Sequence, residues 1–226
     1  MTRGHWAVAA VVVALLAAGG CKDSEQDRPL CEAAQAGRDA LLDRPFEGGD
    51  ALSVFVVGDS YTQGNGVGGP GSAWPAALAG LAGATVTVDG MSSTGYTTAG
   101  FCSGEPVTYG DRFSADDVTG DDVLVVQGSV NDGLTGEPSE VGDAANALLD
   151  EARSAGRIVV VGPPSVPSVA ADELRVMDRG LAAAAEEHDA TYVSLLDAGI
   201  PIRDDDVHPT AAGQQQIAEL VAAALR

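Results

Sequence analysis

From residue 51 onward, short apolar runs alternate with alanine-rich stretches of helical spacing, and this alternation restricts the chain to one class of fold. The runs are continuously apolar, which is typical of strands covered on both faces and hence of a parallel sheet. They are "LSVFVV", "ATVTV", "DVLVVQ", "RIVVVG" and "ATYVSLL". The stretches after them predict covering helices: "AWPAALAGLAG", "SEVGDAANALLDEARSAG", "ADELRVMDRGLAAAAEEH" and "PTAAGQQQIAELVAAALR". We therefore predict a three-layer α/β/α sandwich with a central parallel sheet of about five strands.

The chain has 226 residues, enough for one domain with appendages. We place the domain at 48–226, and before it a segment, 21–47, that contains a tether and one helix, "CEAAQAGRDALLDR". In the last helix of the domain, Pro209 is expected in the first turn, where proline is favoured.

Residues 1–20 have the features of a secretory signal peptide. Arg3 precedes an apolar stretch from Ala7 to Ala18, which is shorter than the roughly 20 residues of a spanning helix. The small residues before Cys21 resemble the lipobox of bacterial lipoproteins, although Ala18 stands where leucine is usual. This resemblance predicts a lipid on Cys21 that anchors the protein to the outer face of the cell membrane. Plain secretion and a retained anchor are the alternatives.

Two cysteines remain after Cys21. Outside the cytoplasm an even pair predicts a disulfide, here between Cys31 and Cys102. The alternative is two buried, unpaired thiols.

The formal net charge of −21 argues against nucleic acid as a partner, because phosphate backbones require basic surfaces. The chain has few basic residues, and this limits which side chain could act as a general base. The single lysine, Lys22, lies in the tether. A serine nucleophile in the domain would therefore need a histidine as its general base.

The candidate nucleophile is Ser60 in "FVVGDSYTQG", which follows the first apolar run directly. Of the two candidate bases, His188 ends a predicted helix, where the helix dipole explains it. His208 lies in "RDDDVHPT", three residues after Asp205, a spacing that lets a carboxylate orient the imidazole ring. Taken alone, this segment is equally consistent with a solvated helix entry.

Together these blocks resemble the SGNH hydrolases, also called the GDSL esterase and lipase family, over residues 51–226. The matching segments are "VVGDSYTQG", "DGMSSTGYTT", "QGSVNDG" and "DDDVHPT". Two departures are visible. Tyr61 stands where the family often has leucine, and we expect this change to have no consequence. Ser129 stands where the family has glycine, so the local backbone is expected to differ slightly.

The resemblance implies a flavodoxin-like fold and a serine esterase without metal or cofactor. It implies that Ser60 attacks the ester, His208 transfers the proton and Asp205 orients His208. The oxyanion donors would be the N–H groups of Ser60 and Gly95, with Gly90 as the reserve for Gly95, and the side-chain amide of Asn131. The absence of a long apolar lid favours short acyl esters, on small molecules or carbohydrate.

Two other functions fit the same residues. A metal-dependent phosphoesterase would use His208 and four acids as ligands: Asp59 and Asp204 to Asp206. A surface-anchored binding module would keep the fold and lack activity. We expect Asp59 to be structural, with its carboxylate bonded to nearby backbone N–H groups, and Asp204 and Asp206 to face solvent.

Overall fold

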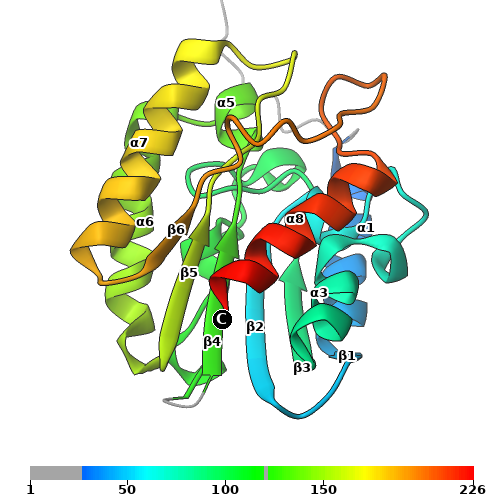
Figure 1. The fold of residues 1–226 in the computed structure, drawn as a ribbon. Coiled ribbons are helices and arrows are strands. Elements are labelled where there is room, and N and C mark those ends of the chain that lie inside the picture. Colours follow the sequence, from blue (N-terminus) through cyan, green and yellow to red (C-terminus); the bar gives the residue numbers. More distant parts are fainter. Residues whose placement is uncertain (1–26, 120–121) are drawn as a thin grey trace, which may run out of the picture.

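A twisted six-stranded sheet forms the centre of the computed structural model, which describes residues 27–119 and 122–226 (Figure 1). The predicted signal peptide and Cys21 lie outside these residues. The strand order is β1-β3-β2-β4-β5-β6. The strands are β1 (Phe46–Glu47), β2 (Leu52–Gly58), β3 (Ala84–Gly90), β4 (Asp122–Gln127), β5 (Arg157–Val161) and β6 (Thr191–Val193).

The five strands from β2 to β6 are parallel and correspond to the five apolar runs, so the predicted fold class is confirmed. The edge strand β1 was not predicted. It pairs with β3 in antiparallel orientation over two residues, too few for a periodic pattern in the sequence.

Helices cover both faces of the sheet. Right-handed crossovers that leave β2 and β4 in opposite directions place their connecting helices on opposite faces. α3 accordingly packs with α8 and α6 packs with α7, while α1 packs against β3 (Figure 1). The helices are α1 (Arg28–Leu42), α2 (Ser60–Gln63), α3 (Trp74–Ala82), α4 (Tyr109–Arg112), α5 (Asn131–Thr135), α6 (Val141–Glu151), α7 (Ala171–Glu187) and α8 (Ala211–Ala224).

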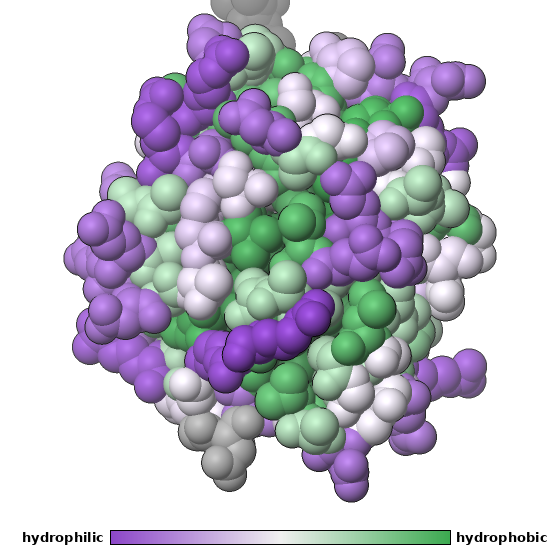
Figure 2. All heavy atoms as spheres, in the orientation of Figure 1, coloured by the Kyte–Doolittle hydropathy of each residue, from purple (hydrophilic) through white to green (hydrophobic). Residues whose placement is uncertain are grey.

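The outer face of α7 is hydrophilic, as Figure 2 shows at the left of the molecule, while its inner face contributes Leu174, Met177 and Leu181 to the core. One expectation about α8 is wrong. Thr210 caps this helix through its hydroxyl, which accepts the Gly213 N–H at 3.1 Å. Pro209 therefore precedes the first turn of α8, and it forms an isolated antiparallel β-bridge with Ile202.

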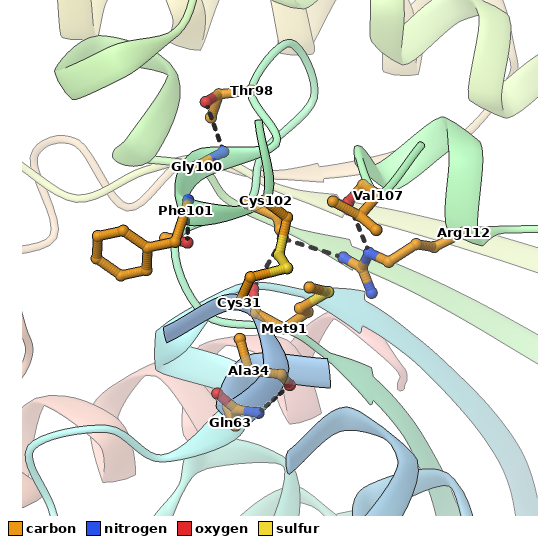
Figure 3. The surroundings of a disulfide bond; sticks show 12 residues. Cys31, Ala34, Gln63, Met91, Thr98, Gly100, Phe101, Cys102, Val107 and Arg112 are labelled. Carbon is orange, nitrogen blue, oxygen red and sulfur yellow. Dashed lines mark hydrogen bonds between the residues drawn. A yellow bond between two sulfur atoms is a disulfide. The ribbon is translucent and has the colours of Figure 1, made fainter. Parts of the chain in front are cut away.

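A disulfide joins Cys31 of α1 to Cys102 in the connection after β3, as predicted from the cysteine count (Figure 3). The bond lies in a small apolar cluster with Met91. α1 is also held electrostatically, because Arg38 donates two hydrogen bonds of 2.7 Å to the buried Asp89 carboxylate. No helix in the described ranges is both long and apolar enough to cross a membrane.

Candidate active site

Ser60 lies where β2 reaches the carboxyl edge of the sheet. Gly58 ends the strand in contact with α2: a Cβ atom there would lie 2.2 Å from Thr62 Oγ1, so only glycine fits. Asp59 then caps α2, and its Oδ1 accepts the Tyr61 N–H at 2.9 Å. This is the structural role expected of Asp59. Because Ser60 is the first residue of α2, its own N–H has no acceptor within the helix.

Residues far apart in sequence meet at Ser60. His208 Nε2 lies 3.1 Å from Ser60 Oγ, and His208 Nδ1 lies 3.1 Å from Asp205 Oδ2. Both His208 and Asp205 come from the loop between β6 and α8. The hydroxyl, imidazole and carboxylate therefore form one continuous hydrogen-bonded chain.

Local backbone geometry fixes the Asp205 carboxylate. Partial burial tends to raise its pKa, but hydrogen bonds from the N–H groups of His208 and Val207, at 2.8 and 3.1 Å, outweigh burial and lower the pKa. Arg203 Nε lies 3.6 Å from the same carboxylate. Asp205 is thus held as the anion that an imidazole requires as partner. Neighbouring Asp204 and Asp206 are exposed, as expected.

Asn131 begins α5 at the end of β4 and is buried beside the loop that follows β3. Its Nδ2 donates to the Thr94 carbonyl oxygen at 2.9 Å, which fixes the orientation of the amide. A side-chain amide carries two hydrogens, so one N–H remains. Ser129, the departure from the family pattern, supports this arrangement because its hydroxyl accepts the Asn131 N–H at 2.9 Å. The peptide bond between Gly128 and Ser129 is cis.

Gly95 is the expected backbone donor to the oxyanion, and its N–H group has a partner within the protein. Its N–H donates to the Thr98 carbonyl oxygen at 2.9 Å, so in this conformation the group is already bonded. Glycine is required there for another reason, since a Cβ atom would lie 2.6 Å from the Asp132 carboxylate. Asp132 binds the N–H groups of Tyr96 and Thr97 at 3.0 and 2.8 Å and thereby organises the loop.

Gly90, the reserve candidate, ends β3 and pairs with Gly58 inside the sheet. A Cβ atom there would lie 3.0 Å from the Thr62 methyl carbon. Close packing against α2 therefore explains this glycine.

The Asp59 carboxylate is fully buried, and burial raises its pKa to about 7 despite the hydrogen bond from Tyr61 N–H. Its Oδ2 has no hydrogen-bond partner within the described residues. The same described ranges hold no group of three or more His, Cys, Asp and Glu side chains placed to bind a metal ion.

His188 is the C-cap residue directly after α7, and the strand β6 starts at Thr191. It therefore lies at the amino edge of the sheet, opposite the site. Two residues that the sequence did not mark as functional do contact the site segments. Tyr61 reaches the loop that carries His208, and Gln214 of α8 donates to the Tyr61 carbonyl oxygen at 3.2 Å. No sequence spacing signals either contact, because the partners lie 146 and 153 residues apart.

The chain matches one protein family and several solved structures. Residues 56–216 match the GDSL-like lipase/acylhydrolase family. A carbohydrate acetylesterase family member from Sinorhizobium meliloti is 16% identical with a TM-score of 0.65, and the match covers 77% of this chain and 97% of that one. The aryl esterase of M. smegmatis is 18% identical with a TM-score of 0.62, over 78% and 99% of the two chains.

A family two carbohydrate esterase from Clostridium thermocellum, solved with cellohexaose, is 18% identical with a TM-score of 0.61, over 77% of this chain and 63% of that one. Comparison with curated protein sequences gives no match. At these identities the structural neighbours establish a shared fold.

Proposed function

Because the chain belongs to the GDSL-like lipase/acylhydrolase family, whose members are carboxylic ester hydrolases, we propose that it is a serine esterase acting through Ser60 on short acyl esters outside the cytoplasm. One observation carries this proposal: the chain of two 3.1 Å contacts from Ser60 Oγ through the His208 ring to Asp205 Oδ2. Nucleophile, base and orienting acid stand in the order that acyl transfer requires.

The hydrogen bonds define the proton transfers. Asp205 accepts a hydrogen bond from the Nδ1–H group of His208, which selects the tautomer with a lone pair on Nε2. Nε2 takes the Ser60 proton as Oγ bonds to the ester carbonyl carbon. The same proton passes to the departing alcohol when the carbon–oxygen bond breaks. Water then repeats the sequence on the acyl-enzyme and releases the carboxylic acid and free Ser60.

The developing oxyanion would be bound by the Ser60 N–H and the remaining N–H of the Asn131 amide. Both groups are oriented before substrate arrives, by the α2 start and by the Thr94 carbonyl respectively. Preorganised donors of this kind stabilise the transition state without reorganisation. The Gly95 N–H is not part of this assignment because Thr98 accepts it.

The proposed substrates are small acyl esters, including acetyl groups on carbohydrate. Of the three structural neighbours reported above, two are described as carbohydrate esterases, one of them in complex with cellohexaose, and the third as an aryl esterase. The strongly acidic composition disfavours polyanionic substrates.

The proposed location is the outer face of the cell membrane, reached through the signal peptide 1–20 and a lipid on Cys21. The disulfide between Cys31 and Cys102 supports an oxidising compartment. Replacing Cys21 by serine should release the protein from the membrane fraction of the producing cells. Retention of Cys21→Ser in that fraction would contradict the lipid anchor.

The function is tested with a panel of p-nitrophenyl esters of increasing acyl length and with acetylated oligosaccharides. We expect hydrolysis that is fastest for acetyl and is lost in Ser60→Ala, with unchanged circular dichroism. Activity should persist in excess chelator, whereas loss with chelator would favour the metal-dependent phosphoesterase. A folded protein that hydrolyses nothing and resists a fluorophosphonate would favour the binding module.

A further inference from the structure

The loop that carries both His208 and Asp205 is held largely by bonds within itself. Arg203 N–H donates to the His208 carbonyl oxygen at 2.9 Å, and Asp206 N–H donates to the Arg203 carbonyl oxygen at 3.0 Å. Its central residues Asp204 to Asp206 are exposed. Such internal bonds keep His208 and Asp205 together, but they do not set the distance from the loop to Ser60, which lies on a different element.

Tyr61 supplies a contact between the two segments. Its side chain is fully buried, and its hydroxyl donates to the carbonyl oxygen of Val207, the residue before His208. Its ring also lies beside the imidazole, with centroids 6.0 Å apart and planes at 54°. Tyr61 directly follows Ser60, and Val207 directly precedes His208. The hydroxyl contact therefore links the chain next to the nucleophile with the chain next to the base.

The backbone of Tyr61 is fixed from the other side. Gln214 of α8 donates to its carbonyl oxygen at 3.2 Å, and the Gln214 Oε1 accepts the Trp74 N–H at 2.9 Å. α8 begins three residues after His208. Tyr61 is therefore bonded both to the loop and to the helix that follows it.

Burial raises the pKa of the Tyr61 phenol well above its ordinary value, with the Asp59 and Asp205 carboxylates adding to the effect. The hydroxyl thus keeps its proton and remains a donor. A buried phenol without an acceptor would be costly, so the contact with the Val207 carbonyl is favoured once the ring is in place.

We propose that Tyr61 is a positioning residue, which holds the Val207 carbonyl and thereby sets the separation of Ser60 Oγ and His208 Nε2. The proposal rests on the function proposed above. It replaces the expectation that tyrosine in place of leucine has no consequence, because a leucine offers no donor to this carbonyl.

The test is Tyr61→Phe, which removes the hydroxyl and keeps the ring. Active sites are counted by the mass of a fluorophosphonate adduct, and turnover of p-nitrophenyl acetate is expressed per site. We expect kcat to fall roughly 10-fold to 100-fold with little change in KM, because the reacting groups are misplaced while the binding surface is retained. Tyr61→Leu should lose at least as much.

The matched control is Tyr192→Phe. This change also removes a partly buried tyrosine hydroxyl, one that donates to Asp178 Oδ1 at 2.7 Å between β6 and α7, outside the site. It should lower the melting temperature and leave kcat per site unchanged. A purely structural role of Tyr61 would give that same pattern.

Wild-type kcat per site in Tyr61→Phe, or a change in KM alone, would overturn the inference. Failure of the proposed function would appear differently, as a wild-type protein that neither reacts with the fluorophosphonate nor hydrolyses esters. If neither Tyr61 variant folds, a crystal structure of the wild type decides. The Tyr61 hydroxyl against the Val207 carbonyl would support the inference, and a hydroxyl directed elsewhere would overturn it.

Discussion

Asp205 binds His208 through both of its carboxylate oxygens: Oδ2 lies 3.1 Å from the ring Nδ1, while Oδ1 accepts the backbone N–H of the same residue at 2.8 Å. The carboxylate therefore fixes the imidazole relative to its own backbone. A ring held in this way presents Nε2 to Ser60 without a search among rotamers, and its tautomer is set by the same contact.

Replacing Asp205 by asparagine should lower kcat roughly 1000-fold or more. An amide can place its N–H against Nδ1, and this would favour the tautomer that has no lone pair on Nε2. The matched control is Asp206→Asn, since Asp206 is exposed and has a φ of 61°, a conformation that asparagine tolerates. Initial rates of p-nitrophenyl acetate hydrolysis measure both variants. Similar losses in the two would show that the loop, rather than Asp205, is responsible.

Asn131→Ala should reduce kcat about 100-fold to 1000-fold, because one donor to the oxyanion is lost while the nucleophile and base remain. Asn146→Ala is the control. This asparagine lies in α6, and its Oδ1 is buried without a partner among the described residues. The prediction fails if Asn131→Ala raises KM but keeps kcat, since the amide would then bind ground state and transition state equally.

Asp59 predicts an unusual dependence of stability on pH. Its folded-state pKa is raised to about 7 by burial, against about 4 in an unfolded chain. Between these two pH values Asp59 is ionised in the unfolded chain and still protonated in the folded protein. The free energy of unfolding therefore falls as pH rises, by about 4 kcal/mol over three pH units. The carboxylate of Asp132 also raises the pKa of Asp59, because it repels the ionised form. Burial raises the pKa of Asp132 as well.

Asp59→Asn isolates this contribution, because the amide oxygen can still accept the Tyr61 N–H. The difference in unfolding free energy between wild type and variant, from urea titrations at pH 4 to 8, should move in favour of the variant as pH rises. Asp116→Asn removes an exposed carboxylate and should show no such trend. A difference that is constant across this range would mean that Asp59 ionises normally in the folded protein.

The disulfide should stabilise the fold by restricting the unfolded chain. Cys31 and Cys102 are 71 residues apart, and closing a loop of this length contributes about 4 kcal/mol on the chain-entropy account. Cys102→Ser, and the wild type in dithiothreitol, should unfold at similarly lowered urea concentrations. Unchanged midpoints in both would contradict the prediction.

The five apolar runs predict the parallel sheet because strands that are buried on both faces are apolar at every position. Such continuous runs are easy to recognise in a sequence. The sequence also identifies Ser60, Asp205 and His208 as candidates. Few side chains in the domain could act as a general base, and the segments that contain these three residues resemble those of a known family. It does not reveal that the Gly95 N–H is bonded to Thr98, since that bond depends on a turn set by the Asp132 carboxylate. The partner of Tyr61 is a backbone carbonyl, which carries no residue identity and leaves no trace in the sequence.

Peptide mass mapping after reaction with a fluorophosphonate shows whether His208 activates the Ser60 hydroxyl. We expect one adduct, on the peptide that contains Ser60, and a reaction at least roughly 1000-fold slower in folded His208→Ala. An adduct on another residue, or equal labelling of Ser60 in His208→Ala, would contradict it.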